Sequence, residues 1–77
     1  MMKVGQYTVT HKEEKDRTVW RDRYLVHRVM KKTADVTVLV SKDYEEFTTV
    51  GVMGRTSRYP LDLLEQQVEN AEYFEFL

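Results

Sequence analysis

Apolar and polar residues alternate along much of the first half of the chain, a pattern typical of β-strands with one buried face. Lys3–His11 consists mostly of β-forming residues and places Tyr7 and Val9 on one side, which predicts a first strand. The following run, Lys12–Arg17, is charged throughout. It predicts a solvated loop between the first strand and the next.

The segment Thr18–Lys31 predicts a second, longer strand whose apolar residues fall on both faces. Strict alternation cannot bury both sets, because successive side chains of a strand point to opposite sides of the sheet. A β-bulge between Arg23 and Arg28 would bring the second set onto the buried face and bend the strand. The two sets are Trp20, Tyr24 and Val26 on one side, and Val19, Leu25 and Val29 on the other.

The strongest strand signal is Val36–Val40, in which the valines at alternate positions are expected to face the core. A short polar segment, Lys31–Asp35, precedes it and predicts a hairpin turn. Together with the second strand this segment forms the long hairpin Arg17–Val40, around which we expect the domain to be organised.

The register of this hairpin decides which basic side chain approaches the core. Pairing Val36 with Met30 turns Arg28 inward, whereas pairing Val36 with Lys31 turns His27 inward. We expect the second register, because burying a neutral imidazole costs less free energy than burying a guanidinium.

The middle of the chain predicts a turn at Ser41–Glu46, a further strand at Phe47–Met53 and a loop at Gly54–Arg58. The sequence from Tyr59 then predicts the one helix, since Pro60 suits a first helical position. Its apolar stripe has helical spacing and comprises Leu61, Leu64, Val68, Ala71 and Phe74. The aromatic tail Tyr73–Leu77 either completes this helix or forms a last short strand.

We therefore predict a mainly β (α+β) fold, a small SH3-like antiparallel barrel of four to five strands with one C-terminal helix. The 77 residues form a single domain, with the barrel at 1–55 and the helix with its aromatic tail at 59–74. The chain has no cysteine, which excludes disulfides and thiolate zinc sites. Because it also has no apolar run of membrane-spanning length and no signal-peptide pattern, we expect it in the cytoplasm.

Four stretches give this layout its likeness to known proteins: Lys3–Gly5 opening a strand, Val26–Val29 before a basic turn, Val36–Val40, and Phe47–Gly54. In their order the chain resembles the SH3-like small barrels and, more loosely, short accessory proteins encoded by bacteriophages and prophages. The resemblance implies binding of peptides, nucleic acid or other proteins through one barrel face. The aromatic ligand groove of the peptide-binding SH3 domains is not recognisable in these residues.

The net charge of −1 hides an uneven distribution. Residues 1–33 hold nine Lys/Arg and four Asp/Glu, a balance of +5, whereas residues 34–77 hold three and nine, a balance of −6. The last segment, Leu61–Leu77, has five acids and no base. Such a separation either steers a charged partner or lets the two halves of the chain attract each other.

The residues that carry chemistry are few. Ser41 and Ser57 are the only serines, and neither lies in a nucleophile motif. The two histidines, His11 and His27, are too far apart in sequence for a zinc pair, and the acids near Asp43 do not follow a calcium-loop pattern. We expect no catalytic site, no metal and no cofactor.

The basic and aromatic stretch Arg17–Tyr24 is a candidate nucleic-acid surface, because Arg21 and Arg23 point one way while Trp20 and Tyr24 point the other. The alternative is an ordinary charged face with Trp20 in the core. The candidate nucleic-acid residues are Arg21, Arg23, Arg28, Lys31 and Lys32.

The aromatic tail is a candidate protein interface, because it holds more apolar groups than a free terminus usually carries. The tail either completes the core, forms a homodimer contact or docks a partner. The candidate interface residues are Trp20, Tyr24, Tyr73, Phe74, Phe76 and Leu77. The leading hypothesis is a non-enzymatic protein-interaction module, an accessory or inhibitory factor of viral or mobile-element origin that binds a host protein; the alternative is nucleic-acid binding through the basic strand.

Overall fold

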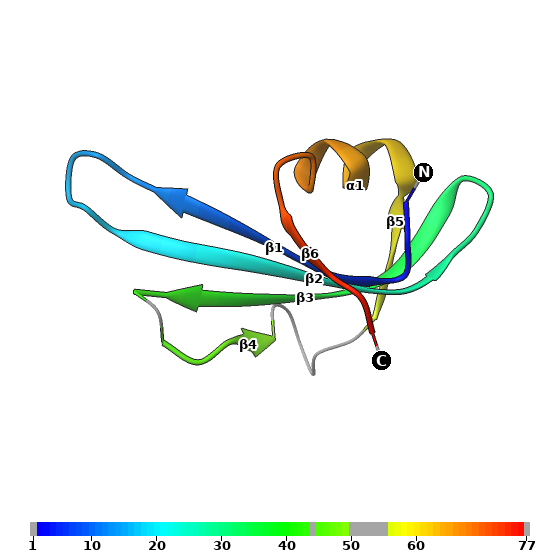
Figure 1. The fold of residues 1–77 in the computed structure, drawn as a ribbon, viewed down its shortest axis with the longest axis horizontal. Coiled ribbons are helices and arrows are strands. Elements are labelled where there is room, and N and C mark those ends of the chain that lie inside the picture. Colours follow the sequence, from blue (N-terminus) through cyan, green and yellow to red (C-terminus); the bar gives the residue numbers. More distant parts are fainter. Residues whose placement is uncertain (1, 44, 50–55, 77) are drawn as a thin grey trace.

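The computed structural model describes residues 2–43, 45–49 and 56–76, which form six strands and one helix (Figure 1). Two long strands occupy the middle of the structure, and the helix lies above one side of the sheet that they form. In chain order the elements are β1 (Gly5–Lys12), β2 (Val19–Val29), β3 (Thr33–Lys42), β4 (Thr48–Thr49), β5 (Ser57–Pro60), α1 (Leu61–Gln67) and β6 (Glu72–Phe74).

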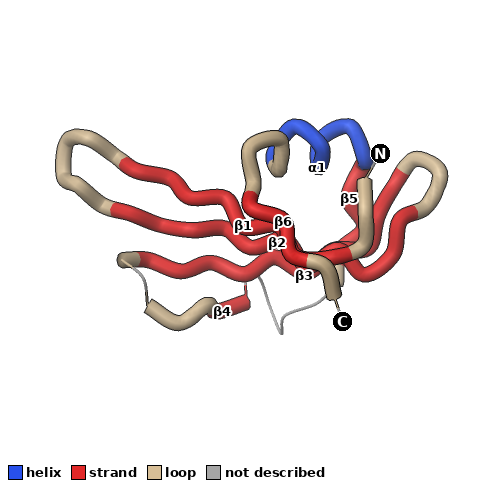
Figure 2. The backbone as a smooth tube through the Cα atoms, in the orientation of Figure 1, coloured by secondary structure: helices blue, strands red, loops and turns tan. Residues whose placement is uncertain are grey.

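All strand pairs are antiparallel and belong to one sheet with the order β4-β3-β2-β1-β6, to which β5 is added by pairing with β3 (Figure 2). β4 and β5 thus share the same side of β3, at opposite ends of that strand. The sheet curves around α1, with β5 on one side of the helix and β6 on the other. The predicted fold class, a small mainly β antiparallel structure with one helix near the C-terminus, is confirmed.

The two longest strands form the predicted hairpin, and the predicted bulge is present. The pairing of β2 with β3 shifts register between Val26 and Arg28, which leaves His27 outside the pairing. Because of this shift, Val29 packs against the same core as Val26 although it belongs to the other alternating set. The bulge therefore lets one strand bury residues from both sets.

Both registers considered from the sequence are wrong. Val36 pairs with Val26, and His27 is exposed instead of facing the core. The turn also comes earlier than predicted, since Met30 donates its backbone N–H to the carbonyl oxygen of Thr33 over 2.8 Å. A shorter turn moves every residue of β3 toward the start of β2, so that two fully buried valines meet across the hairpin.

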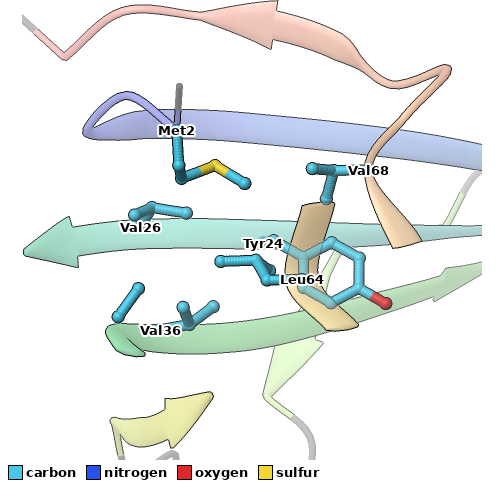
Figure 3. Packing of buried hydrophobic residues seen from close by; sticks show 7 residues of the cluster. Met2, Tyr24, Val26, Val36, Leu64 and Val68 are labelled. Atoms are coloured by element: carbon cyan, nitrogen blue, oxygen red, sulfur yellow. The ribbon is translucent and has the colours of Figure 1, made fainter. Parts of the chain in front are cut away.

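The core lies between α1 and the side of the sheet that faces it, called here the inner face (Figure 3). Leu64 of α1 is fully buried, as are Val26 and Val36 beneath it. Val38 packs at the edge of this core, whereas Val40, which we also expected to face it, is half-buried and lies outside the cluster. The buried apolar residues are Met2, Tyr24, Val26, Ala34, Val36, Leu64 and Val68.

Tyr24 is the largest ring in this core. Its ring meets that of Tyr59 from β5 edge-on, with 6.5 Å between the ring centroids. Burial raises the pKa of Tyr24, and the nearby Asp22 and Tyr59 raise it further. Tyr24 therefore contributes as a neutral packing residue.

The helix is shorter than predicted, because α1 ends at Gln67 and does not continue to Phe74. Val68 is its C-cap, and the chain then turns back to the sheet, where β6 pairs with β1. The strand alternative for the aromatic tail is therefore the one that the structure shows. Pairing satisfies backbone groups at the edge of β1, which further turns of helix would leave open.

Tyr73 and Gly5 hold β6 close to β1. The Tyr73 ring lies 4.9 Å from that of Tyr7, and its hydroxyl donates a hydrogen bond to the carbonyl oxygen of Val4. Gly5 has a φ of +153°, and a Cβ added there would lie 2.6 Å from the Tyr73 ring and 2.9 Å from the carbonyl oxygen of Phe74. Glycine is therefore required for this close approach.

The segment before the helix also differs from its prediction. Ser57–Pro60, expected as the end of a loop and the start of the helix, forms the edge strand β5. Pro60 suits such an edge, since it has no N–H to offer to a further strand. Of the strand predicted at Phe47–Met53, only Thr48–Thr49 is observed, and its part at 50–53 lies outside the described residues.

Candidate nucleic-acid interface

The side of the sheet that faces away from α1 is called here the outer face. It carries the strand residues that alternate in sequence with the core-facing ones. On β2 this alternation places Arg21 and Arg23 on the outer face, as the sequence predicted. On the neighbouring strand β1, Thr8 lies opposite Arg23 and Thr10 opposite Arg21, while Gln6 lies opposite Leu25. The outer face therefore combines guanidinium groups with neutral polar side chains.

The two arginines share one aromatic ring. The guanidinium carbon of Arg23 lies 3.8 Å from the centroid of the Phe47 ring, and that of Arg21 lies 4.6 Å from it. A ring attracts a cation through its electron-rich face, and a guanidinium stacks on such a face better than an ammonium does. Phe47 thus holds both planar groups in place.

Hydrogen bonds to the neighbouring strands fix the two arginines further. The Arg21 Nη2 donates to Ser41 Oγ over 3.2 Å, and the Arg23 Nε donates to Thr8 Oγ1 over 3.3 Å. Partial burial lowers the pKa of Arg23, and the charge of Arg21 beside it lowers that pKa further. Arg23 stays charged at neutral pH despite this shift, since a guanidinium loses its proton only far above neutral pH. Two like charges side by side favour an anion at this position.

A groove of about 410 Å³ lies next to this pair on β1, β2 and β6. Most of its lining residues are polar or charged, and Phe74, which also lines it, is 64% exposed. Glu72 is the one acid among its lining residues, so that the side chains of the lining carry one net positive charge. The lining residues are Gln6, Thr8, Thr10, Arg21, Arg23, Glu72, Tyr73 and Phe74.

A second aromatic group continues the outer face toward the bulge. The ring of Phe76 stacks on that of His27, with 6.2 Å between centroids and 20° between planes. His27 Nε2 is also hydrogen-bonded to Thr37 Oγ1 over 2.8 Å. The bulge therefore turns His27 outward, where it supports Phe76, which is itself 41% exposed.

Four of the five predicted nucleic-acid residues lie in two pairs, and the fifth, Arg28, lies between them. Arg21 and Arg23 line the groove, whereas Lys31 and Lys32 are exposed at the turn of the β2–β3 hairpin. Arg28 is exposed between these groups, opposite Asp35 in the register. That aspartate is itself in contact with an arginine of β5, since Arg58 Nε lies 3.5 Å from its Oδ1.

The six predicted interface residues do not share one surface. Tyr24 is buried in the core, and Trp20 lies on the inner side, where its ring stacks on His11. Tyr73 packs on Tyr7, and only Phe74 and Phe76 are on the outer face. Leu77 lies outside the described residues.

The acids of the helix lie on the opposite side of the molecule. Asp62, Glu65 and Glu69 are exposed and line a shallow depression along α1 and the residues that follow it, and α1 covers the inner face (Figure 1). These three carboxylates and the arginines of the outer face thus lie on different sides of the sheet, whereas Glu72 lies on the outer face with the arginines.

Other candidate sites are limited. His11 Nε2 lies 3.0 Å from Asp22 Oδ2, an isolated pair on the inner side. In the described ranges, no cluster of three or more His, Cys, Asp and Glu side chains could hold a metal ion. In the same part of the chain, no helix has the length and apolar character needed to cross a membrane.

Sequence reasoning missed Phe47 and the polar row of β1. The sequence places Tyr7 and Val9 on one side of the first strand, and the same alternation puts Gln6, Thr8 and Thr10 together on the other side. No comparable signal marks Phe47, because its contact with the arginines depends on how the segment after β3 folds back over the sheet.

Comparison with known proteins adds no assignment: no protein-family model, no curated protein and no solved structure matches the chain. The likeness to SH3-like barrels and phage accessory proteins stays a prediction.

Proposed function

We propose that this protein is a non-enzymatic module that binds nucleic acid through the outer face of its sheet. The observation that carries the proposal is the pair Arg21 and Arg23, stacked on Phe47 beside a polar groove. Guanidinium groups bind phosphate through two parallel hydrogen bonds, and a fixed guanidinium loses less conformational freedom when it does so.

Three further observations support this proposal over the protein-binding hypothesis that led from the sequence. The hydroxyl and amide groups of β1 offer neutral hydrogen-bond partners next to the arginines. The helix acids lie on the opposite side, so they do not repel a polyanion from the outer face. The residues expected to form the protein interface are divided between the core, the inner side and the outer face.

The test is a fluorescence anisotropy titration of labelled oligonucleotides with the full chain at two salt concentrations. We expect binding at about 50 mM salt that weakens at about 200 mM, since phosphate contacts release counterions. With about three phosphate contacts, the logarithm of the association constant should fall with the logarithm of the salt concentration with a slope of about −2. Absence of binding at low salt would exclude this function.

A second candidate function is binding of a protein partner in the cytoplasm, as an accessory or inhibitory factor. The observation that favours it is the position of β6, which is an edge strand of the sheet with Phe74 and Phe76 exposed. An edge strand can accept a strand from another chain, and exposed aromatic rings are common in interfaces. Sedimentation of the chain alone would detect the homodimer that the same edge permits. A monomer mass at high protein concentration would exclude that homodimer.

A further inference from the structure

We infer that the groove beside Arg21 and Arg23 takes a single strand of nucleic acid, with an unpaired base stacked on Phe74. This inference rests on the proposed function, because it specifies the form of nucleic acid that the outer face binds. It depends on three features of the groove: an exposed ring, a row of neutral polar groups and two fixed cations.

The first feature is the exposure of Phe74. Phe74 is the most exposed of the large apolar residues in the described part of the chain, at 64%, although β6 is held to β1 by backbone pairing and by the contact of the neighbouring Tyr73 with Tyr7. Fixing a phenyl ring in water brings no gain in stability, whereas the ring can stack on any base. Within a duplex the bases are already stacked on one another, so only its end pairs could reach this ring, whereas every base of a single strand can do so.

The second feature is the order of residues across the sheet. Phe74 lies opposite Gln6, and Glu72 lies opposite Thr8, which in turn lies opposite Arg23. The backbone positions of Phe74 and Arg23 are therefore two residues apart along β1, roughly 7 Å, and two strand spacings apart across the sheet, roughly 10 Å. A nucleotide whose base stacks on Phe74 and whose phosphate approaches Arg23 would cross the side chains of Gln6 and Thr8. Both side chains could form hydrogen bonds with the sugar or with the edge of the base.

The third feature is the position of Glu72 in the same lining. This carboxylate repels phosphate from the β6 side of the groove, and Arg21 and Arg23 attract it to the β2 side. The bound nucleic acid is thereby oriented with its sugar-phosphate backbone over β2 and its bases toward β6. A duplex has phosphates on both of its edges and would bring one of them against Glu72.

The experiment compares one labelled single-stranded DNA of about 20 nucleotides with its blunt duplex, using the full chain and two variants at Phe74. We expect the single strand to bind about tenfold more tightly than the duplex. Phe74→Leu should weaken single-strand binding about tenfold and leave duplex binding unchanged, whereas Phe74→Tyr, which keeps the ring, should bind like the unaltered chain. Circular dichroism checks the fold of both variants, which should be unchanged because Phe74 is exposed.

Equal affinity for single strand and duplex, or full single-strand affinity in Phe74→Leu, would overturn the inference and leave the proposed function standing. Absence of binding to either form would overturn both. Because a duplex would bring phosphate against Glu72, Glu72→Gln should raise the affinity for the duplex more than the affinity for the single strand. An equal gain for both forms, or a larger gain for the single strand, would contradict the orientation given above.

Discussion

Replacing both Arg21 and Arg23 with glutamine is expected to lower the affinity for single-stranded nucleic acid by roughly one hundredfold. Each guanidinium would make a charge-assisted contact worth about 1.5 kcal/mol or more, and 1.4 kcal/mol corresponds to a factor of ten. The dependence on salt should weaken as well, with the slope reduced by about 1.4 because two phosphate contacts are lost. Anisotropy titrations at several salt concentrations measure both quantities.

Two variants separate the role of these arginines from the effect of net charge. Lys3→Gln combined with Lys15→Gln removes the same charge from exposed positions that do not line the groove, and should change the affinity by less than about threefold. Replacing Arg21 and Arg23 with lysine keeps the charge and loses the stacking on Phe47, so the salt dependence should be retained while the affinity falls. An equal loss of affinity in the Lys3 and Lys15 variant would show that the outer face is not the site.

Leu64→Ala is expected to destabilise the protein by about 2–5 kcal/mol. Leu64 is fully buried and is the side chain through which α1 fills the space above Val26 and Val36. A chain of 77 residues has a free energy of unfolding of about 4–12 kcal/mol, so the loss is a large part of the total. Urea denaturation followed by circular dichroism measures the change in the free energy of unfolding.

The neighbouring leucine provides the matched control. Leu63 lies on the same helix and is 44% exposed, so Leu63→Ala removes the same atoms from a position that faces water. Its effect should stay within about 1 kcal/mol. Similar losses for the two variants would mean that α1 does not pack on the sheet through Leu64.

The hairpin shows what alternation in a sequence can and cannot determine. Two apolar sets on opposite faces of one strand require a bulge, and the bulge is found between Val26 and Arg28. The register could not be obtained in the same way, because it depends on where the turn closes. The polar residues around the turn gave no reason to place Thr33 in the strand, where it accepts the hydrogen bond from Met30.

In the C-terminal segment, tertiary contacts prevail over the helical pattern of the sequence. The apolar spacing from Leu61 to Phe74 fits a helix throughout, and helical spacing alone cannot say where the helix stops. In the structure the helix ends at Gln67, because the following residues pair with the free edge of β1 and Tyr73 packs in the space that Gly5 leaves. Both are tertiary features, which a single sequence does not display.

The sequence predicted which arginines lie at the candidate site, but it did not predict the aromatic rings that lie beside them. Alternation in β2 placed Arg21 and Arg23 on one face, and the fold confirms this placement. The ring that joins them, Phe47, and the exposed ring beside them, Phe74, come from segments far away in sequence. Their meeting depends on the order of the strands in the sheet.

The most direct test of the account is an NMR titration of the ¹⁵N-labelled full chain with an unlabelled single-stranded oligonucleotide. If the outer face binds nucleic acid, the amide signals of Thr8, Thr10, Arg23 and Phe74 should shift most, while those of α1 stay in place. Shifts that centre on α1 or on the inner side around Trp20, or an unchanged spectrum at millimolar oligonucleotide, would contradict it.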